Sequence, residues 1–132
     1  MTESLISPKS ELARKGETLA CDHLIRKGYV IIQRNYRIGQ GELDIIARIS
    51  ITVKGSERNE LVFVEVKTRE SAFLTDPSQL VPLTKQRQVI RLASTYLKTL
   101  KTMERARFDI VIVVHNAQYT RIEHIEDAFY PM

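Results

Sequence analysis

The strand-like segment Leu61–Lys67 holds two side chains that could do chemistry, Glu65 and Lys67. Successive residues of a strand point to opposite faces, so these two side chains share one face with Leu61 and Phe63. An acid and a base therefore lie two residues apart on the same side of a strongly hydrophobic strand. Such a pair is found in sites that handle protons or cations, and also on ordinary solvated strand faces.

Asp44 supplies a second acid in an apolar context, within Leu43-Asp44-Ile45-Ile46. If the two segments form an antiparallel hairpin centred near Lys54-Gly55, Asp44 pairs with Glu65, Ile45 with Val64 and Arg48 with Leu61. A bulge or a shift in register would change these pairs. In this register the two carboxylates lie on one sheet face with Cβ atoms ~4.5–5.5 Å apart, where like charges destabilise a sheet.

A positive charge must offset that repulsion, and the residues leave two candidates open. A hard divalent ion such as Mg²⁺ takes oxygen ligands, including one or two carboxylates. Lys67 could instead neutralise the acids as a structural ion pair. A third acid is Glu17. At a helical rotation of ~100° per residue, it lies at the flank of the apolar stripe of the first expected helix. From there it could reach over the sheet edge toward Asp44 and Glu65, or extend into water.

The elements that position these residues follow from periodicity and from capping residues. We expect a helix from Ser7, as N-cap, and Pro8 to Gly28 in a C′ position. Strands are expected at Tyr29–Ile32, ending near Asn35, and at Glu42–Ile49. The second of these alternates, with Leu43, Ile45, Ala47 and Ile49 on one face and Glu42, Asp44, Ile46 and Arg48 on the other. The charged segment Lys54–Asn59 is expected to be a loop.

The second half of the chain predicts a helix followed by two strands. Thr84 is a suitable N-cap for a helix with an apolar stripe of Val89, Leu92, Ala93, Tyr96, Leu97 and Leu100. Phe108–Val114 is typical of a strand covered on both faces, and Tyr119–Ile125 of an edge strand. We therefore expect one α/β domain over residues 1–132, with a mixed sheet of about five strands flanked by helices. Residues 1–7 and 127–132 are expected to be flexible tails.

Composition narrows the class of protein. The chain has 132 residues, a formal net charge of +4, 43% hydrophobic residues and one cysteine, Cys21. The length suits a single domain, and a lone cysteine indicates a reducing compartment, so we expect a cytoplasmic protein. No segment approaches the ~20 apolar residues of a membrane span. The first eight residues include Glu3 and no apolar stretch, so we expect no secretion signal.

Basic residues cluster in two segments. Residues 85–107 hold seven Lys and Arg against one acid, and residues 9–37 hold seven against three acids. Such clusters are typical of proteins that bind a phosphate backbone, and equally of solvated helix faces. Charge alone leaves both interpretations open.

Other chemistries fit the sequence poorly. His23, His115 and His124 do not show zinc-ligand spacing with Cys21. Gly39-Gln40-Gly41 leads into a strand and not a helix, which excludes a dinucleotide-binding fingerprint. Cys21 has no evident partner base, so we expect it to be a buried or half-buried packing residue.

Several motifs together resemble a known family. They are Gly16-Glu17, Gly28-Tyr29, Arg34-Asn35-Tyr36-Arg37, Gly41-Glu42-Leu43-Asp44-Ile45-Ile46-Ala47 and Val62-Phe63-Val64-Glu65-Val66-Lys67-Thr68-Arg69. They resemble the bacterial YraN family, whose members look like the PD-(D/E)XK nuclease superfamily, nearest to archaeal Holliday-junction resolvases. The match runs from about Gly16 to Asp109. Leu43 stands where the superfamily name has proline, and the expected loop between Ser50 and Glu60 is longer than the family's tight turn.

The resemblance implies a restriction-endonuclease-like core and a Mg²⁺- or Mn²⁺-dependent endonuclease for structured or branched DNA. By position, Asp44 and Glu65 would bind the metal with the backbone carbonyl of Val66, and Lys67 would be the catalytic lysine. Glu17 would match the helix glutamate of the resolvase-like branch. Alternatives are a non-catalytic nucleic-acid-binding scaffold with the same fold and a nuclease acting on RNA. Resolvase-like relatives are dimers, so a homodimer is implied as well.

Five residues are expected to contact nucleic acid: Arg37, Lys85, Gln86, Arg87 and Arg91. Lys85 and Gln86 open the second helix, whose positive N-terminal end favours phosphate. An ordinary exposed first turn is the alternative for both, and a turn contact is the alternative for Arg37.

Overall fold

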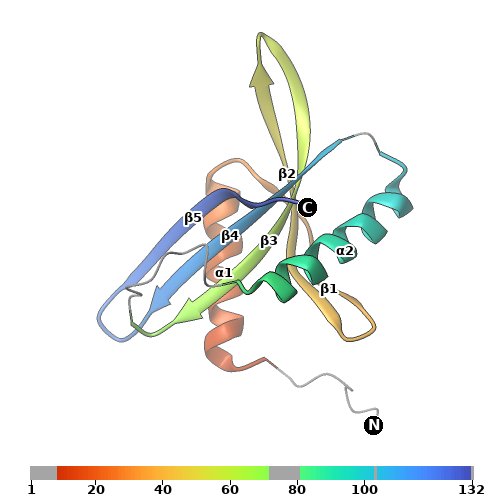
Figure 1. Ribbon diagram of the computed structural model, residues 1–132. Helices are drawn as coiled ribbons and strands as arrows, with labels where there is room; N and C mark the ends of the chain where they lie inside the picture. Colours follow the sequence, from red (N-terminus) through yellow and green to blue (C-terminus); the bar gives the residue numbers. More distant parts are fainter. Residues whose placement is uncertain (1–8, 72–80, 103, 132) are drawn as a thin grey trace.

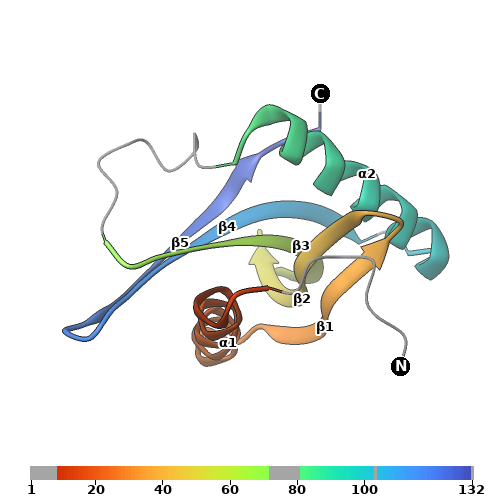
Figure 2. The same ribbon diagram turned by 90° about the horizontal axis from the view of Figure 1, so that it is seen from below.

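The structure is a computed structural model that describes residues 9–71, 81–102 and 104–131. A five-stranded sheet runs through it in the order β1-β2-β3-β4-β5, with α1 on one face and α2 on the other (Figures 1 and 2). The elements are α1 (Glu11–Arg26), β1 (Val30–Ile38), β2 (Gly41–Val53), β3 (Ser56–Arg69), α2 (Leu83–Leu100), β4 (Arg105–His115) and β5 (Thr120–Phe129).

The sheet is mixed because of one crossover. β1, β2 and β3 form an antiparallel meander, β4 lies parallel to β3, and β5 returns antiparallel at the edge. A parallel neighbour requires a long connection, which α2 provides as it crosses one face. The predicted α/β fold, a five-stranded mixed sheet flanked by two helices, is confirmed, and it is consistent with a restriction-endonuclease-like core.

Two hydrophobic clusters hold the helices to the sheet. Against α2, the side chains of Val89, Leu92 and Tyr96 pack on Leu61 and Phe63 of β3. On the opposite face, Ala20, Cys21 and Leu24 of α1 pack on Val62, Val64, Val111 and Val113. The residues of β3 alternate between the clusters, as its sequence predicts, so both faces of the central strands are buried. The prediction that Cys21 is a buried packing residue is confirmed.

Both helices begin at other residues than predicted. Ser10 is the N-cap of α1, and its hydroxyl accepts a hydrogen bond from the Ala13 N–H at 3.1 Å. The predicted start at Ser7 and Pro8 lies outside the described residues. Pro82, not Thr84, is the N-cap of α2, and no side chain caps that end. The Pro82 carbonyl already accepts the first helical hydrogen bond, from the Gln86 N–H, so Thr84 lies inside the first turn. Gly28 follows α1 with φ +96°, as expected for a C′ glycine.

The predicted loop between β2 and β3 is wrong. The strands pair as far as Val53↔Ser56, which leaves a two-residue turn, Lys54-Gly55, with φ values of 51° and 80°. Positive φ at both turn residues is the geometry that a tight hairpin favours. The charged residues that suggested a loop are exposed on an arm, yellow to yellow-green in Figure 1, that projects beyond the sheet. The predicted pairs Ile45↔Val64 and Arg48↔Leu61 are confirmed.

The other strands are also longer than predicted, and β4 spans Arg105–His115 instead of Phe108–Val114. β1 continues to Ile38 instead of closing near Asn35. β5 continues to Phe129, whose buried ring stacks on Phe108 with centroids 5.4 Å apart. The expectation of a tail from residue 127 is therefore wrong for residues 127–129, because Phe129 completes the cluster beneath α2. The expected tail at residues 1–7 lies outside the described residues.

None of the described helices is long and apolar enough to cross a membrane.

A buried ion cluster ties the start of β4 to the start of β3 and to the residue before β1. Arg107, 6% exposed, donates to Asp109 at 2.7 and 3.0 Å and to Glu60 at 3.1 Å, and it contacts the Tyr29 hydroxyl. Burial alone raises the pKa of Asp109, but hydrogen bonds from His124 and Arg107 outweigh burial and hold this pKa below its ordinary value of 3.8. The acids and the guanidinium thus satisfy one another, as buried charges must.

The contacts of His124 assign its tautomer. Its Nε2 lies 2.7 Å from Asp109 Oδ2, and its Nδ1 lies 2.8 Å from Lys27 Nζ. An ammonium group can only donate, so Nδ1 accepts and Nε2–H donates to the carboxylate. His124 therefore links Lys27, the C-cap residue of α1, to Asp109.

We predict that Asp109→Asn lowers the free energy of unfolding by about 3–5 kcal/mol at neutral pH, because it leaves Arg107 buried with less counter-charge. Since the folded pKa of Asp109 lies below its unfolded value, its stabilisation is complete above about pH 5 and is lost as the pH falls through the folded pKa. The difference between wild type and variant, measured by urea unfolding, should therefore shrink toward about pH 3. The exposed Glu123→Gln change serves as control, and a pH-independent difference would contradict the assignment.

Candidate active site

A glycine brings α1 close to β3 at the end of the sheet. A Cβ atom placed on Gly16 would lie 1.8 Å from Thr68 Oγ1, so no larger residue fits this crossing without displacing β3 or the helix. The next residue, Glu17, is consequently pressed against the sheet and is 3% exposed. Of the two fates open to Glu17 from sequence, the structure has it reach over the sheet.

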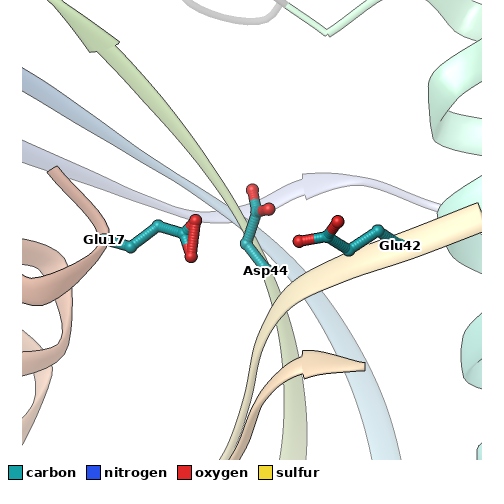
Figure 3. A group of neighbouring side chains, drawn as sticks. All are labelled: Glu17, Glu42 and Asp44. Atoms are coloured by element: carbon teal, nitrogen blue, oxygen red, sulfur yellow. The ribbon is translucent and has the colours of Figure 1, made fainter. Parts of the chain in front are cut away.

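Three carboxylates converge there, as Figure 3 shows. Glu17 comes from α1, and Glu42 and Asp44 come from β2. Each offers an oxygen, and these oxygens lie within 4.8 Å of one another. Like charges so close repel strongly in a partly buried setting, so the arrangement requires a cation among them.

The ammonium group of Lys9 provides that charge. Its Nζ lies 2.9 Å from Asp44 Oδ1 and 2.6 Å from Glu42 Oε1, and it also contacts Glu17. A fourth oxygen, Oδ1 of Asn35, accepts from Nζ at 2.8 Å, and Asn35 has a left-handed backbone with φ 53°. Burial disfavours the charged lysine, but the surrounding carboxylates outweigh burial and raise the pKa of Lys9. The acids thus enclose one cation position, which Lys9 Nζ fills.

The acids of this cluster differ in their tendency to ionise. Burial and the charge of Asp44 raise the pKa of Glu17, although Lys9 opposes them. For Glu42, burial is outweighed by Lys9 and by Arg37, whose Nε donates to Glu42 Oε2 at 3.1 Å, so the pKa of Glu42 is lowered. The cluster therefore contains one firmly ionised acid and one that accepts a proton more readily.

Glu65 lies near this cluster but outside the set of three. It is 2% exposed, and Oε1 has no hydrogen-bond partner among the described residues. Burial and the neighbouring charge of Asp44 raise its pKa well above the ordinary value. Lys85 Nζ lies 4.0 Å from Glu65 Oε2. Burying a carboxylate oxygen without a partner costs free energy, unless a water, an ion or a ligand pairs with it.

The strands separate where these acids lie. The last pair of the β2–β3 ladder is Ile45↔Val64, so Asp44 and Glu65 are not ladder partners as the hairpin inference had placed them. Instead, Asp44 Oδ2 accepts a hydrogen bond at 2.9 Å from the Val66 N–H. The alternation expected for β2 is also wrong at Leu43, which packs with Ile46 beneath α2, whereas Ile45 and Ala47 pack beneath α1. The alternation therefore changes between Leu43 and Ile45, and the residue between them, Asp44, lies beside Glu17.

Some of the remaining predicted residues interact with the acids or with the backbone, and others are exposed on α2. Lys67 lies half-buried, and its positive charge acts on Glu65. Lys85 also turns inward and donates to the Glu42 carbonyl at 3.2 Å. Gln86 donates to the Val81 carbonyl at 2.9 Å. Arg37 pairs with Glu42, as described above, while Arg87 and Arg91 are exposed on the outer side of α2.

Sequence reasoning missed three members of the site, Lys9, Asn35 and Glu42. Glu42 carried a usable signal, because it lies two residues before Asp44 and shares its expected face. Asn35 was part of a recognised motif, and asparagine is favoured in left-handed backbone. Lys9 carried no signal in the sequence, because only the fold brings it to acids that lie up to 35 residues away along the chain.

The donor set suits a hard divalent ion. Carboxylate oxygens from Glu17, Glu42 and Asp44 surround one position, and the unpaired oxygen of Glu65 lies close by. Mg²⁺ and Mn²⁺ prefer such all-oxygen sets. An ion would have to displace the Lys9 ammonium from this position.

Comparison with known proteins places this chain among uncharacterised relatives. Residues 16–113 match the uncharacterised protein family UPF0102. A UPF0102 protein of Bacteroides thetaiotaomicron is 40% identical over 122 residues, which cover 92% of this chain and 94% of the relative. A UPF0102 protein of Geobacter metallireducens is 41% identical over 119 residues, covering 89% and 91%. The matched residues span the whole candidate site except Lys9.

We predict that Lys9→Met lowers the free energy of unfolding by about 1–2 kcal/mol in EDTA, because three acids then lose their shared cation. The variant should also bind Mn²⁺ more tightly than wild type, and Mn²⁺ should restore its melting temperature. Calorimetric titration and thermal unfolding measure both effects. Lys15→Met, an exposed lysine of α1, is the matched control. Unchanged stability and unchanged Mn²⁺ affinity would contradict this description of the site.

Proposed function

The chain belongs to the UPF0102 family, also called the YraN family, and from that premise and the geometry of its acids we propose that it is a metal-dependent endonuclease of the PD-(D/E)XK type. Its proposed reaction is hydrolysis of phosphodiester bonds in structured or branched DNA. One observation carries the proposal: three carboxylates from α1 and β2 surround one cation position, and nearby Glu65 of β3 has a buried oxygen with no hydrogen-bond partner among the described residues.

The proposed roles follow from the contacts. Asp44 and Glu65, together with the Val66 carbonyl and the nearby Glu17 and Glu42, would hold Mg²⁺ or Mn²⁺. The Val66 N–H orients Asp44 through its hydrogen bond to Oδ2. An ion bound there would supply a water of lowered pKa and would stabilise charge on the phosphate oxygens. Glu65 would be ionised in the loaded site, which favours binding as the pH rises.

Two lysines would act on the reacting groups. Lys67, on the strand of Glu65, would orient the attacking water and take part in its deprotonation. It is a compact cation with three donors, and the described residues give it no hydrogen bond or ion pair. Lys85 would contact the phosphate from the first turn of α2, where it already lies near Glu65.

The position of Lys9 favours a second candidate, a non-catalytic nucleic-acid-binding scaffold. An ammonium group that neutralises the acids makes a metal unnecessary for the fold. Metal titration separates the candidates, since a scaffold need not bind Mn²⁺ through Asp44 and Glu65. An RNA substrate requires the same chemistry and is separated only by assay. The homodimer implied by resolvase-like relatives stays a prediction that sedimentation velocity can test.

We predict metal-dependent cleavage of branched, flapped or single-stranded DNA with Mg²⁺ or Mn²⁺, measured on gels with an RNA substrate in parallel. Asp44→Asn, Glu65→Gln and Lys67→Met should each reduce the rate on the order of 100-fold or more, because each removes a ligand or a water-orienting group. Glu123→Gln, an exposed acid of β5, should cleave as wild type does.

Cleavage that persists at the wild-type rate in Glu65→Gln and Lys67→Met proteins would contradict the nuclease mechanism. Absence of cleavage together with absence of Mn²⁺ binding in the Lys9→Met protein would favour the scaffold.

We also predict that Glu65→Gln makes the protein more stable at about pH 8, on the order of 1–2 kcal/mol. The folded pKa of Glu65 lies above its unfolded value, so the folded state binds the extra proton and wild-type stability falls as the pH rises between the two. Glutamine keeps the shape without a buried charge. Urea unfolding at about pH 5 and about pH 8 measures the effect, which should be small at the lower pH. Equal stability of the two proteins at both pH values would show that the Glu65 charge is well accommodated without a metal.

A further inference from the structure

The outer side of α2 carries positive charge, and the helix has no acidic residue of its own to balance it. Residues 83–100 contain no Asp or Glu and include Lys85, Arg87, Arg91 and Lys98. Arg87 and Arg91 are exposed and lie one helical turn apart. Within the described part of the chain, neither guanidinium forms an ion pair or a side-chain hydrogen bond. These two cations are therefore available to a ligand.

A hollow of about 500 Å³ lies beside these arginines. Leu83 and Ile90 of α2 line it with apolar surface, and Tyr130, just beyond β5, contributes an aromatic ring. Tyr130 is 60% exposed and Leu83 is 44% exposed, although both are large apolar or aromatic residues. The hollow thus joins an exposed aromatic ring, an apolar wall and two cations, and none of the described residues that line it is acidic.

We propose that this hollow binds an unpaired nucleotide of a nucleic-acid strand, with the base stacked on Tyr130 and its phosphates on Arg87 and Arg91. The proposal rests on the proposed nuclease function and defines its substrate class as nucleic acid with an unpaired segment. An aromatic ring that stacks on a base requires an exposed base face, which single strands offer and duplexes hide. Guanidinium groups supply the phosphate contacts that give such binding most of its affinity.

The position of the hollow fits a strand that leads to the candidate active site. Lys85, which reaches Glu65 and Glu42, lies about 200° around α2 from Arg87. The two sides of the helix are therefore separated by about one helix diameter, ~10 Å. Figure 2 shows α2 over the sheet, with its other side turned away from the strands. A strand that crosses the first turns of α2 would pass from the hollow to the acids.

The test is binding in EDTA, where no cleavage occurs, by fluorescence anisotropy of a labelled oligo-dT of about 10 nucleotides. Tyr130→Ala should weaken binding about 5-fold or more, and Tyr130→Phe should bind as wild type does, since the ring is what stacks. Arg87→Ala and Arg91→Ala should each weaken binding and reduce the slope of log affinity against log salt by about 0.7. A duplex of equal length should respond little to Tyr130→Ala.

Lys98→Ala is the matched control, because it removes a cation from the same helix away from the hollow. The proposal is overturned if Tyr130→Ala leaves single-strand affinity unchanged, if it weakens duplex binding equally, or if Lys98→Ala matches Arg87→Ala. An oligo-U arm distinguishes RNA from DNA as the source of the unpaired strand. The cleavage assay tests the nuclease function separately. Strand binding without cleavage would support the nucleotide-binding hollow and contradict the nuclease function. Cleavage together with an unchanged affinity of Tyr130→Ala would contradict the hollow and support the nuclease function.

Discussion

Mutual repulsion among carboxylates governs the candidate site of this protein. Glu17, Glu42 and Asp44 bring oxygens within 4.8 Å of one another at a partly buried position, which is unfavourable unless a cation lies among them. The chain meets that requirement with the ammonium group of Lys9. The same oxygens suit a hard divalent ion, so the arrangement that a tethered lysine stabilises is also one that a metal could take over.

The sheet makes this crowding possible because it is rigid on both faces. Two hydrophobic clusters clamp the central strands between α1 and α2, so the strand ends cannot relax away from the charges. Gly16 permits the close crossing that brings Glu17 to the sheet, and the β2–β3 ladder ends at Ile45↔Val64, next to Asp44. The energy of packing in the core thus holds acidic side chains in positions they would leave if the backbone were free.

The two charged clusters of the fold differ in how completely they are paired. Around Arg107, every acid has a cation or a neutral donor, and Asp109 is stabilised in its ionised form. Near Asp44, Glu65 has an oxygen that no described residue pairs with, and its ionised form is disfavoured. The closed cluster joins β3, β4 and β5, and the incomplete one has capacity for a ligand. This contrast, more than the presence of acids, is what makes the second cluster the candidate functional site.

Local sequence pattern determined the helices, the strands, their order and the register of the central hairpin, because periods of 3.6 and 2 residues and the short turn are properties of neighbouring residues. It also singled out Asp44, Glu65 and Lys67, whose types and spacing are local. It misread the hairpin arm as a loop, since exposure on both strand faces removes the apolar alternation. Only the tertiary structure decided that Lys9 joins Glu17, Glu42 and Asp44, and that Glu65 is left incomplete. Contacts between groups up to 35 residues apart depend on how two helices settle on a twisted sheet, and no local pattern carries that information.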